Sequence, residues 1–128
     1  MEKILTISIA AYNAEKYISK CLDSLLNTRV RDQLEIIIVN DGSTDDTLII
    51  AQRYYVNYPN IIKIIDKENG GHGSTINASI KEATGKYYKI IDSDDWVDEN
   101  GLEKLVDYLS YHNVDMVLNP FNEVYVDR

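Results

Sequence analysis

Short apolar runs, rich in isoleucine and valine, alternate along this chain with segments of helical spacing. The runs that predict strands are residues 4–10, 34–40, 61–65, 87–91 and 114–118. The segments that predict helices are residues 14–27, 45–55, 74–83 and 100–111. Strands that alternate with helices predict βαβ units, and therefore a mainly parallel sheet with helices on both faces. The expected fold class is α/β, a Rossmann-like three-layer α/β/α domain.

Two of the expected helices carry signals at their ends. Ser43 or Thr44 can cap the second helix, whose first turn would then hold Asp45 and Asp46 at its positive end. Gly85 follows the third helix and is suited to be its C-terminal cap. These signals predict where the connecting loops begin and end.

The whole chain is expected to form one domain. Its 128 residues suffice for one hydrophobic core, and no linker, repeat or low-complexity tract interrupts the pattern. Residues 120–128 look like the start of a further strand. We therefore expect residues 1–128 to be a single domain that is truncated before a further region of a longer protein.

The charge and the single cysteine limit the classes of partner and compartment. The chain has 13 basic and 21 acidic residues and a formal net charge of −8, which argues against wide contact with nucleic acid. Cys21 excludes an internal disulfide, and its helical stripe with Ile18, Leu22 and Leu25 predicts a buried structural thiol. No signal-peptide pattern and no apolar stretch of about 18 residues is present. These features predict a cytoplasmic protein.

Four polar or glycine-rich segments follow the expected strands. They are residues 10–13, 41–43, 70–73 and 92–95. Because ligands of open α/β sheets bind at the carboxyl ends of the strands, we expect these segments to meet at one ligand-binding edge. The glycines lack the G-x-G-x-x-G spacing and no P-loop is present, which excludes both kinds of nucleotide site.

Three carboxylates are crowded at this edge, because Asp92, Asp94 and Asp95 directly follow an expected strand. Like charges this close raise one another's pKa unless a cation lies among them. Carboxylate oxygens are preferred ligands of Mg²⁺ and Mn²⁺, which are often shared with substrate phosphates. Asp41 at the same edge strengthens this interpretation. The alternative is a solvated acidic turn that caps the helix over residues 100–111, since Asp98 and Glu99 lie near the N-terminus of that helix.

Three further residues near this edge have two interpretations each. Tyr12 can stack on a nucleobase, but taken alone it is expected to be a core aromatic residue. His72 can touch a phosphate or a metal ion, but a residue of a flexible loop is the simpler interpretation. Trp96 is expected to pack beneath the acidic turn rather than to form a platform for substrate.

Taken in order, these segments resemble the family 2 glycosyltransferases, which have the GT-A fold. The matching stretches are SIAAYNAEKYISKCLDSLL, IIIVNDGSTDDT and ENGGHGSTINASIKEATGKYYKIIDSDDW, which together span most of the chain. The resemblance implies an inverting, metal-dependent hexosyltransferase. Its donor would be a nucleotide-diphosphate sugar, UDP-linked, and its acceptor a glycan or a lipid-linked molecule in cell-surface polysaccharide synthesis. A lipid-linked acceptor would bring the protein to the inner face of the membrane as a peripheral protein.

The resemblance also implies roles for particular residues. Ala10 and Tyr12 match positions that hold the base, and Asp41 matches the acid that hydrogen-bonds it. Asp92 and Asp94 match the D-x-D pair, in which the first acid lies toward the ribose and metal and the second ligates Mn²⁺ or Mg²⁺ on the donor diphosphate. The residues implied in nucleotide-sugar binding are thus Ala10, Tyr12, Asp41, Asp92, Ser93 and Asp94.

The resemblance places the general base of the reaction beyond residue 128. Glu123 and Asp127 are candidates by residue type only. Two positions depart from the family pattern: Ile76 precedes Asn77 where an arginine is frequent, and Ser79 stands where a glycine is common. The departures mark either a subgroup or weaker binding of the donor.

Three rival interpretations are compatible with an α/β domain of this length. A Mg²⁺-binding receiver domain would need paired acids after the first strand, where this chain has Ala10-Ala11-Tyr12-Asn13. A sugar nucleotidyltransferase would need a glycine-rich basic loop at that place. The third rival is a module that binds nucleotide-sugar and has no activity in isolation.

Overall fold

The computed structural model describes residues 3–111, 116–118 and 124–127, and these show the predicted alternation of strands and helices. The strands are β1 (Leu5–Ala11), β2 (Leu34–Asp41), β3 (Ile62–Lys67), β4 (Tyr87–Asp92), β5 (Met116–Leu118) and β6 (Val124–Asp127). The helices are α1 (Ile18–Leu26), α2 (Thr47–Asn57), α3 (His72–Glu82) and α4 (Glu99–Tyr111), with a short 3-10 turn over Arg31–Gln33. Residues 114–115, 120–123 and 128 of the two segments predicted near the C-terminus lie outside the described residues.

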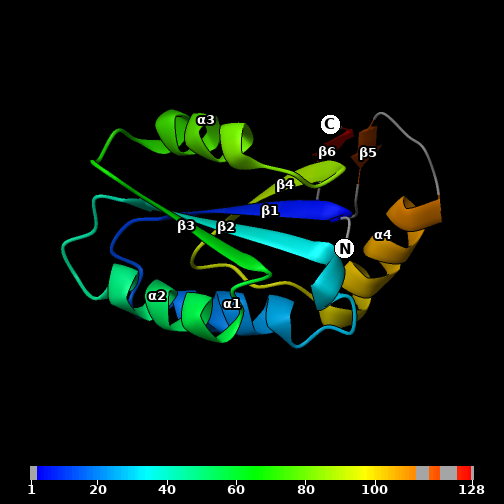
Figure 1. Cartoon of the computed structure of the whole chain (residues 1–128), viewed down its shortest axis with the longest axis horizontal. Helices are drawn as coiled ribbons and strands as arrows, with labels where there is room; N and C mark the ends of the chain where they lie inside the picture. The colour runs from blue at the N-terminus through cyan, green and yellow to red at the C-terminus, as the bar shows by residue number, and fades with distance from the viewer. Residues whose placement is uncertain (1–2, 112–115, 119–123, 128) are drawn as a thin grey trace.

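The six strands form one sheet in the order β3-β2-β1-β4-β6-β5. β1 is parallel to β2 and β4, and β2 is parallel to β3, whereas β6 is antiparallel to both β4 and β5. α3 covers one face of the sheet, while α1 and α2 cover the other, with α4 beside α1 (Figure 1). The prediction of a mainly parallel three-layer α/β/α domain is confirmed.

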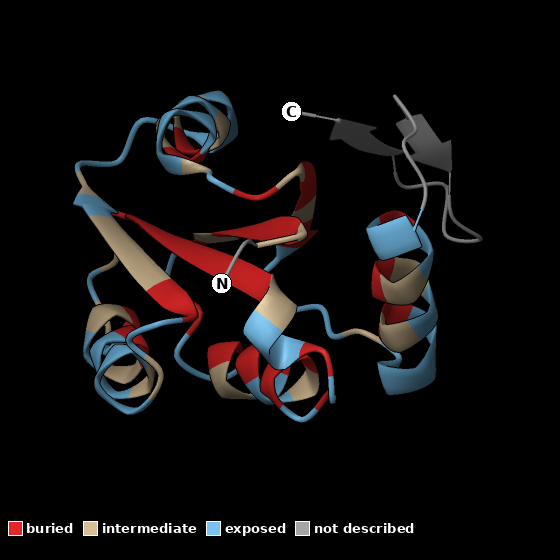
Figure 2. Cartoon of the chain, turned by 45° about the vertical axis from the view of Figure 1, so that its right-hand side comes forward, coloured by how far each residue is buried: buried red, intermediate tan, exposed pale blue. Residues whose placement is uncertain are grey.

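The apolar core lies between the sheet and the layer of α1, α2 and α4. Alternate residues of β1 point into it, and the central strands are buried along their length while the outer sides of the helices are exposed (Figure 2). Cys21 is fully buried in this core, as predicted. Burial raises the pKa of its thiol to about 12, and the negative charges of Asp95, Asp94 and Asp92 act in the same direction. A thiol with so high a pKa is not a nucleophile near neutral pH.

The face of the sheet toward α3 buries Ile37 and Val39 and also carries a set of polar contacts. Glu35 of β2 is buried and accepts hydrogen bonds from Thr6 Oγ1 at 2.7 Å, Thr84 N at 2.7 Å and Thr84 Oγ1 at 2.6 Å. Lys63 Nζ of β3 lies 2.7 Å from its Oε2. Burial raises the pKa of Glu35, but these hydrogen bonds outweigh that effect and lower it to about 2. Glu35 therefore ties three strands and the loop after α3 together.

The predicted helix caps are wrong in detail. α2 begins at Thr47, so Ser43 and Thr44 lie before the helix and do not cap it. Asp45 and Asp46 also precede its first turn, although Asp45 Oδ1 accepts the N–H of Thr47 at 3.0 Å. The capping preference of serine and threonine was misleading here because these side chains bond to another loop, described below.

Gly85 is not a helix cap either, because α3 ends at Glu82 and continues into extended backbone at Ala83. It is instead a point of close approach. The N–H of Gly85 donates to Thr6 Oγ1 at 2.9 Å, and a Cβ at this position would lie 2.6 Å from Thr6 N. Only a residue without a side chain allows the chain to pass so close to β1.

We expect Gly85→Ala to lower the free energy of unfolding by about 2 kcal/mol, because the added methyl group meets backbone that cannot move aside. Urea unfolding followed by circular dichroism would measure the loss. Gly73→Ala is the matched control: it lies in α3, a Cβ there would meet nothing within 4 Å, and alanine favours a helix. Equal effects of the two substitutions would contradict the close-approach explanation.

Candidate functional site

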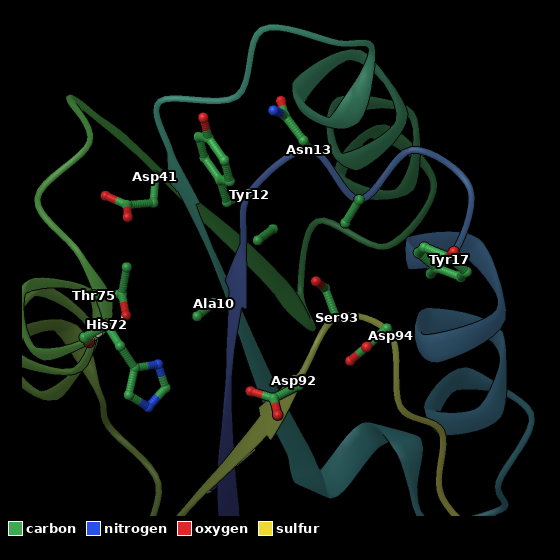
Figure 3. A pocket seen from close by; sticks show the side chains of 12 residues that line it. Ala10, Tyr12, Asn13, Tyr17, Asp41, His72, Thr75, Asp92, Ser93 and Asp94 are labelled. Atoms are coloured by element: carbon green, nitrogen blue, oxygen red, sulfur yellow. Dashed lines mark hydrogen bonds between the residues drawn. The ribbon is translucent and has the colours of Figure 1, made fainter.

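A pocket of about 420 Å³ opens at the carboxyl ends of the parallel strands, where the sequence predicted a ligand-binding edge. β1 runs through the middle of the pocket, with Asp41 and the first turn of α3 on one side of it and the turn after β4 on the other (Figure 3). The six residues predicted to bind nucleotide-sugar all line this pocket: Ala10, Tyr12, Asp41, Asp92, Ser93 and Asp94. The structure thus brings them together, and their individual roles stay predictions.

The three carboxylates that follow β4 are close enough to share one ion. One ligand oxygen from each of Asp92, Asp94 and Asp95 lies within 4.8 Å of the others, and all three residues are exposed. The chain turns tightly here, because Asp95 N–H donates to the carbonyl of Asp92 at 3.0 Å. Burial and the charges of Asp94 and Asp92 raise the pKa of Asp95. An all-carboxylate set of this kind fits the hard ions Mg²⁺ and Mn²⁺.

The alternative interpretation, a solvated acidic turn that caps the following helix, relied on Asp98 and Glu99, and the contact of Asp98 agrees with it. Asp98 Oδ2 accepts the N–H of Gly101 at 2.9 Å in the first turn of α4. The turn of α4 is therefore capped by an acid outside the cluster. The charges of Asp92 and Asp94 remain directed toward the pocket (Figure 3).

Asp41, at the end of β2, is nearly buried and is held from several directions. Its Oδ1 accepts from Lys67 Nζ at 3.0 Å and from Gly70 N at 2.9 Å, and its Oδ2 accepts from Gly71 N at 3.1 Å. Burial alone raises the pKa of this carboxyl group, but these three hydrogen bonds hold it below its ordinary value. Asp41 is therefore ionised near neutral pH and fixes the loop before α3. Oδ2 accepts one bond in this structure and has room for another donor.

Tyr12 lies in the loop after β1, which is hydrogen-bonded to the loop after β2. Thr44 N–H donates to Asn13 Oδ1 at 2.8 Å, and Asn13 N–H donates to Ser43 Oγ at 3.0 Å. Asn13 has a φ of 48°, a left-handed conformation that asparagine tolerates well. Tyr12 is 53% exposed at the rim of the pocket, so the interpretation of this residue as a core aromatic is wrong.

The loop of Asp41 is also pressed against the loop before α3. Gly42 has a φ of 74°, and a Cβ there would lie 2.7 Å from Asn69 N. A side chain at this position would be strained by its backbone and would also push Asn69 away. The glycine thus allows the two loops that carry Asp41 and Gly70 to touch.

His72 lies in the first turn of α3 and not in a flexible loop, which corrects the expectation for this residue. α3 begins at His72, two residues before the predicted start, and Thr75 Oγ1 donates to the carbonyl of His72 at 2.6 Å. Both side chains line the pocket. The run of glycines before the helix hid its true beginning, because glycine is unfavourable in helices.

Trp96 does not pack beneath the acidic turn as predicted. Its side chain is 59% exposed, and Lys20 Nζ of α1 lies 3.6 Å from its ring centroid. The contact is a cation–π interaction at the surface. The indole therefore lies outside the core, and its cation comes from a segment distant in sequence.

Ser79 has a structural explanation in this chain. It is fully buried in α3, and its Oγ lies 2.7 Å from Ser8 Oγ and 2.5 Å from Tyr88 OH. The hydroxyl joins α3 to β1 and β4 on the face away from the apolar core. Nothing in the structure explains Ile76.

Sequence reasoning missed three residues that line the pocket: Ala14, Tyr17 and Thr75. Tyr17 is 53% exposed just before α1, and Thr75 is buried under the first turn of α3. Position after a strand was the signal that found the other residues. Tyr17 and Thr75 instead belong to helix starts, where the pattern of the sequence predicts packing.

The strand order excludes a receiver domain. Receiver domains place the first strand between the second and third, as in the order 2-1-3-4-5. Here β1 lies between β2 and β4, and β3 is at the edge.

Within the described residues, no helix combines the length and the apolar content that crossing a membrane requires.

Comparisons with known proteins find relatives that are named as a polysaccharide synthase and a glycosyltransferase. The chain is 41% identical over 104 residues to a chondroitin synthase of Escherichia coli, which covers 81% of this chain and 15% of that protein. It is 39% identical over 116 residues to a poly(ribitol-phosphate) beta-glucosyltransferase of Bacillus spizizenii, which covers 89% of this chain and 18% of that protein. This chain thus spans less than a fifth of each relative.

A solved structure that contains a nucleotide-sugar shares the fold of this chain. S. aureus TarS 1-349 in complex with UDP-GlcNAc superposes with a TM-score of 0.80 at 32% identity, covering 90% of this chain and 33% of that one. The profile of the family Glycosyl transferase family 2 matches residues 6–127. The family match also excludes a sugar nucleotidyltransferase. This chain belongs to glycosyltransferase family 2 and has its GT-A fold.

Proposed function

We propose that this chain is the donor-binding part of an inverting, metal-dependent glycosyltransferase that uses a UDP-linked sugar. The observation that carries the proposal is the pocket itself, in which Asp92 and Asp94, at and just after the end of β4, line the same pocket as Tyr12 and Asp41 in a member of family 2. The complex of TarS with UDP-GlcNAc, at 32% identity, supports a uridine nucleotide. The named activities of the relatives support an acceptor that is a glycan or a lipid-linked molecule of a cell-surface polysaccharide.

Each part of the pocket has a role in this proposal. The main chain of Ala10 and the ring of Tyr12 hold the base, and the free capacity of Asp41 Oδ2 accepts an N–H of the uracil. Ser93 lies between the acids that face the ribose and diphosphate. The metal-binding residues are Asp94 and Asp92, and Asp95 completes the cluster. A bound Mn²⁺ or Mg²⁺ would supply Lewis-acid stabilisation of the leaving diphosphate.

The acceptor half of the reaction is proposed to lie outside this chain. The carboxylates that line the described pocket are Asp41, Asp92 and Asp94, and all three are assigned to the donor. A general base must therefore come from elsewhere, and the relatives have long further regions that can supply it. We propose that residues 1–128 form the nucleotide-sugar-binding domain, located in the cytoplasm at the inner face of the membrane when the acceptor is lipid-linked.

Calorimetric titration of UDP into this chain, with and without Mn²⁺, tests the proposal. We expect Mn²⁺-dependent binding, and we expect Tyr12→Ala to weaken it by about 10-fold because stacking of one base on an aromatic ring is lost. Tyr12→Phe keeps the ring and is the matched control, with affinity close to that of the wild type. Absence of UDP binding under both conditions would refute the proposal for this chain.

A further inference from the structure

Three carboxylates line the pocket, and very little near them can offset their negative charge. Among the described residues that line the pocket there is no lysine and no arginine, and His72 is the one basic residue. Lys67 is near, but its Nζ is engaged by Asp41 Oδ1 at 3.0 Å and by the carbonyl of Glu68 at 2.7 Å. The imidazole of His72 is thus the available N–H donor of a basic side chain in the described lining.

His72 is also placed where an anion would be favoured. It begins α3, an 11-residue helix whose N-terminal end faces the pocket. The N-terminal end of a helix carries a partial positive charge, and its first N–H groups have no partner within the helix. In Figure 3 the imidazole and the carboxylate of Asp92 lie on either side of Ala10, at the same end of the pocket.

The start of α3 is fixed by hydrogen bonds, so the backbone position from which the imidazole of His72 extends is defined. Asp41 fixes Gly70 and Gly71 through their N–H groups, and Thr75 N–H donates to the carbonyl of Gly71 at 3.2 Å. The side chain of Thr75 then bonds the carbonyl of His72 at 2.6 Å. The backbone that carries His72 is therefore fixed on both sides, while its own side chain is exposed.

We propose that His72 donates a hydrogen bond to the diphosphate of the donor, opposite the acidic cluster; this inference rests on the proposed function. Each phosphate of a sugar nucleotide carries a negative charge, and one divalent ion also has to offset Asp92 and Asp94. An imidazole N–H, which is present in both protonation states, offsets part of the remaining charge. His72 is thus a specificity-determining residue for diphosphates over nucleosides.

The test compares UDP with uridine, each titrated in the presence of Mn²⁺ into the wild-type chain, His72→Ala and His72→Gln. We expect His72→Ala to weaken UDP by about 10-fold and to leave uridine unchanged, and we expect His72→Gln, which keeps an N–H donor, to recover part of the loss. Because His72 is exposed, both variants should keep the melting temperature of the wild type.

Other outcomes would overturn the inference in distinguishable ways. Equal weakening of UDP and uridine would show a structural role for His72, and no change in either would show no role. A loss of affinity for Mn²⁺ titrated alone would make His72 a metal ligand instead. Failure of the wild-type chain to bind UDP at all would refute the proposed function, and this inference with it.

Discussion

Replacing Asp94 with asparagine is expected to weaken UDP binding in the presence of Mn²⁺ by at least about 100-fold, the upper end of the loss caused when only an outer-shell partner of a metal ligand is changed. Asparagine keeps the size of the side chain but removes the charge and one strong oxygen donor from the cluster of Asp92, Asp94 and Asp95. The remaining two acids cannot form the same set of ligands. Calorimetric titration of UDP with and without Mn²⁺ measures the effect.

The control for this prediction is Asp32→Asn, which removes the same charge from an exposed acid at the opposite end of β2. It leaves the overall charge of the protein equal to that of the Asp94 variant, so a loss confined to Asp94→Asn is a property of the pocket. Undiminished Mn²⁺-dependent binding by Asp94→Asn would show that the acidic turn is not the metal site. Equal losses in both variants would point to a general effect of charge.

The ends of the strands were the most predictable part of this molecule. A nearly continuous apolar run has few alternatives to a buried strand, and the parallel order of such strands forces the residues after them to one edge. Ala10, Asp41 and Asp92 were found at the pocket by this reasoning alone. Local composition was sufficient because the geometry of the sheet supplies the long-range information.

The beginnings of the helices were less predictable, because contacts between distant segments decide them. Ser43 has the composition of a cap, but its Oγ accepts the N–H of Asn13 instead. His72 follows two glycines, yet the helix starts there because Asp41 holds the N–H groups of Gly70 and Gly71. No pattern within either segment indicates these bonds.

The polar contacts of Glu35 on the face of the sheet toward α3 could also not be predicted from the sequence. An acid within LEIIIVN gave no sign that it would be buried, since a single Glu at a strand end is normally exposed. Its partners come from positions 6, 63 and 84, so they can be recognised only when the strands are assembled. The stability of this face therefore depends on a residue that the sequence does not single out.

For that residue we expect Glu35→Ala to lower the free energy of unfolding by about 3 kcal/mol. The substitution leaves the buried hydroxyl of Thr6 without its acceptor, and also the N–H and Oγ1 of Thr84, which is exposed. Leaving the charge of Lys63 without its partner costs less stability, because its side chain is 44% exposed and can turn to water. Glu35→Gln keeps the volume and one acceptor oxygen, so a loss of about half that size is expected. Urea unfolding measures both.

The pH dependence separates the charge of Glu35 from its shape. The pKa of Glu35 is about 2 in the folded protein, below its ordinary value of 4.5, so its ionised form stabilises the fold above pH 4.5. That contribution declines as the pH falls from 4.5 toward 2, because the unfolded chain takes up a proton first. The difference between the wild type and Glu35→Gln should therefore be full near neutral pH and should shrink at about pH 3. A difference that stays constant over this range would mean that hydrogen-bond geometry, and not the charge, holds the sheet to the loop after α3.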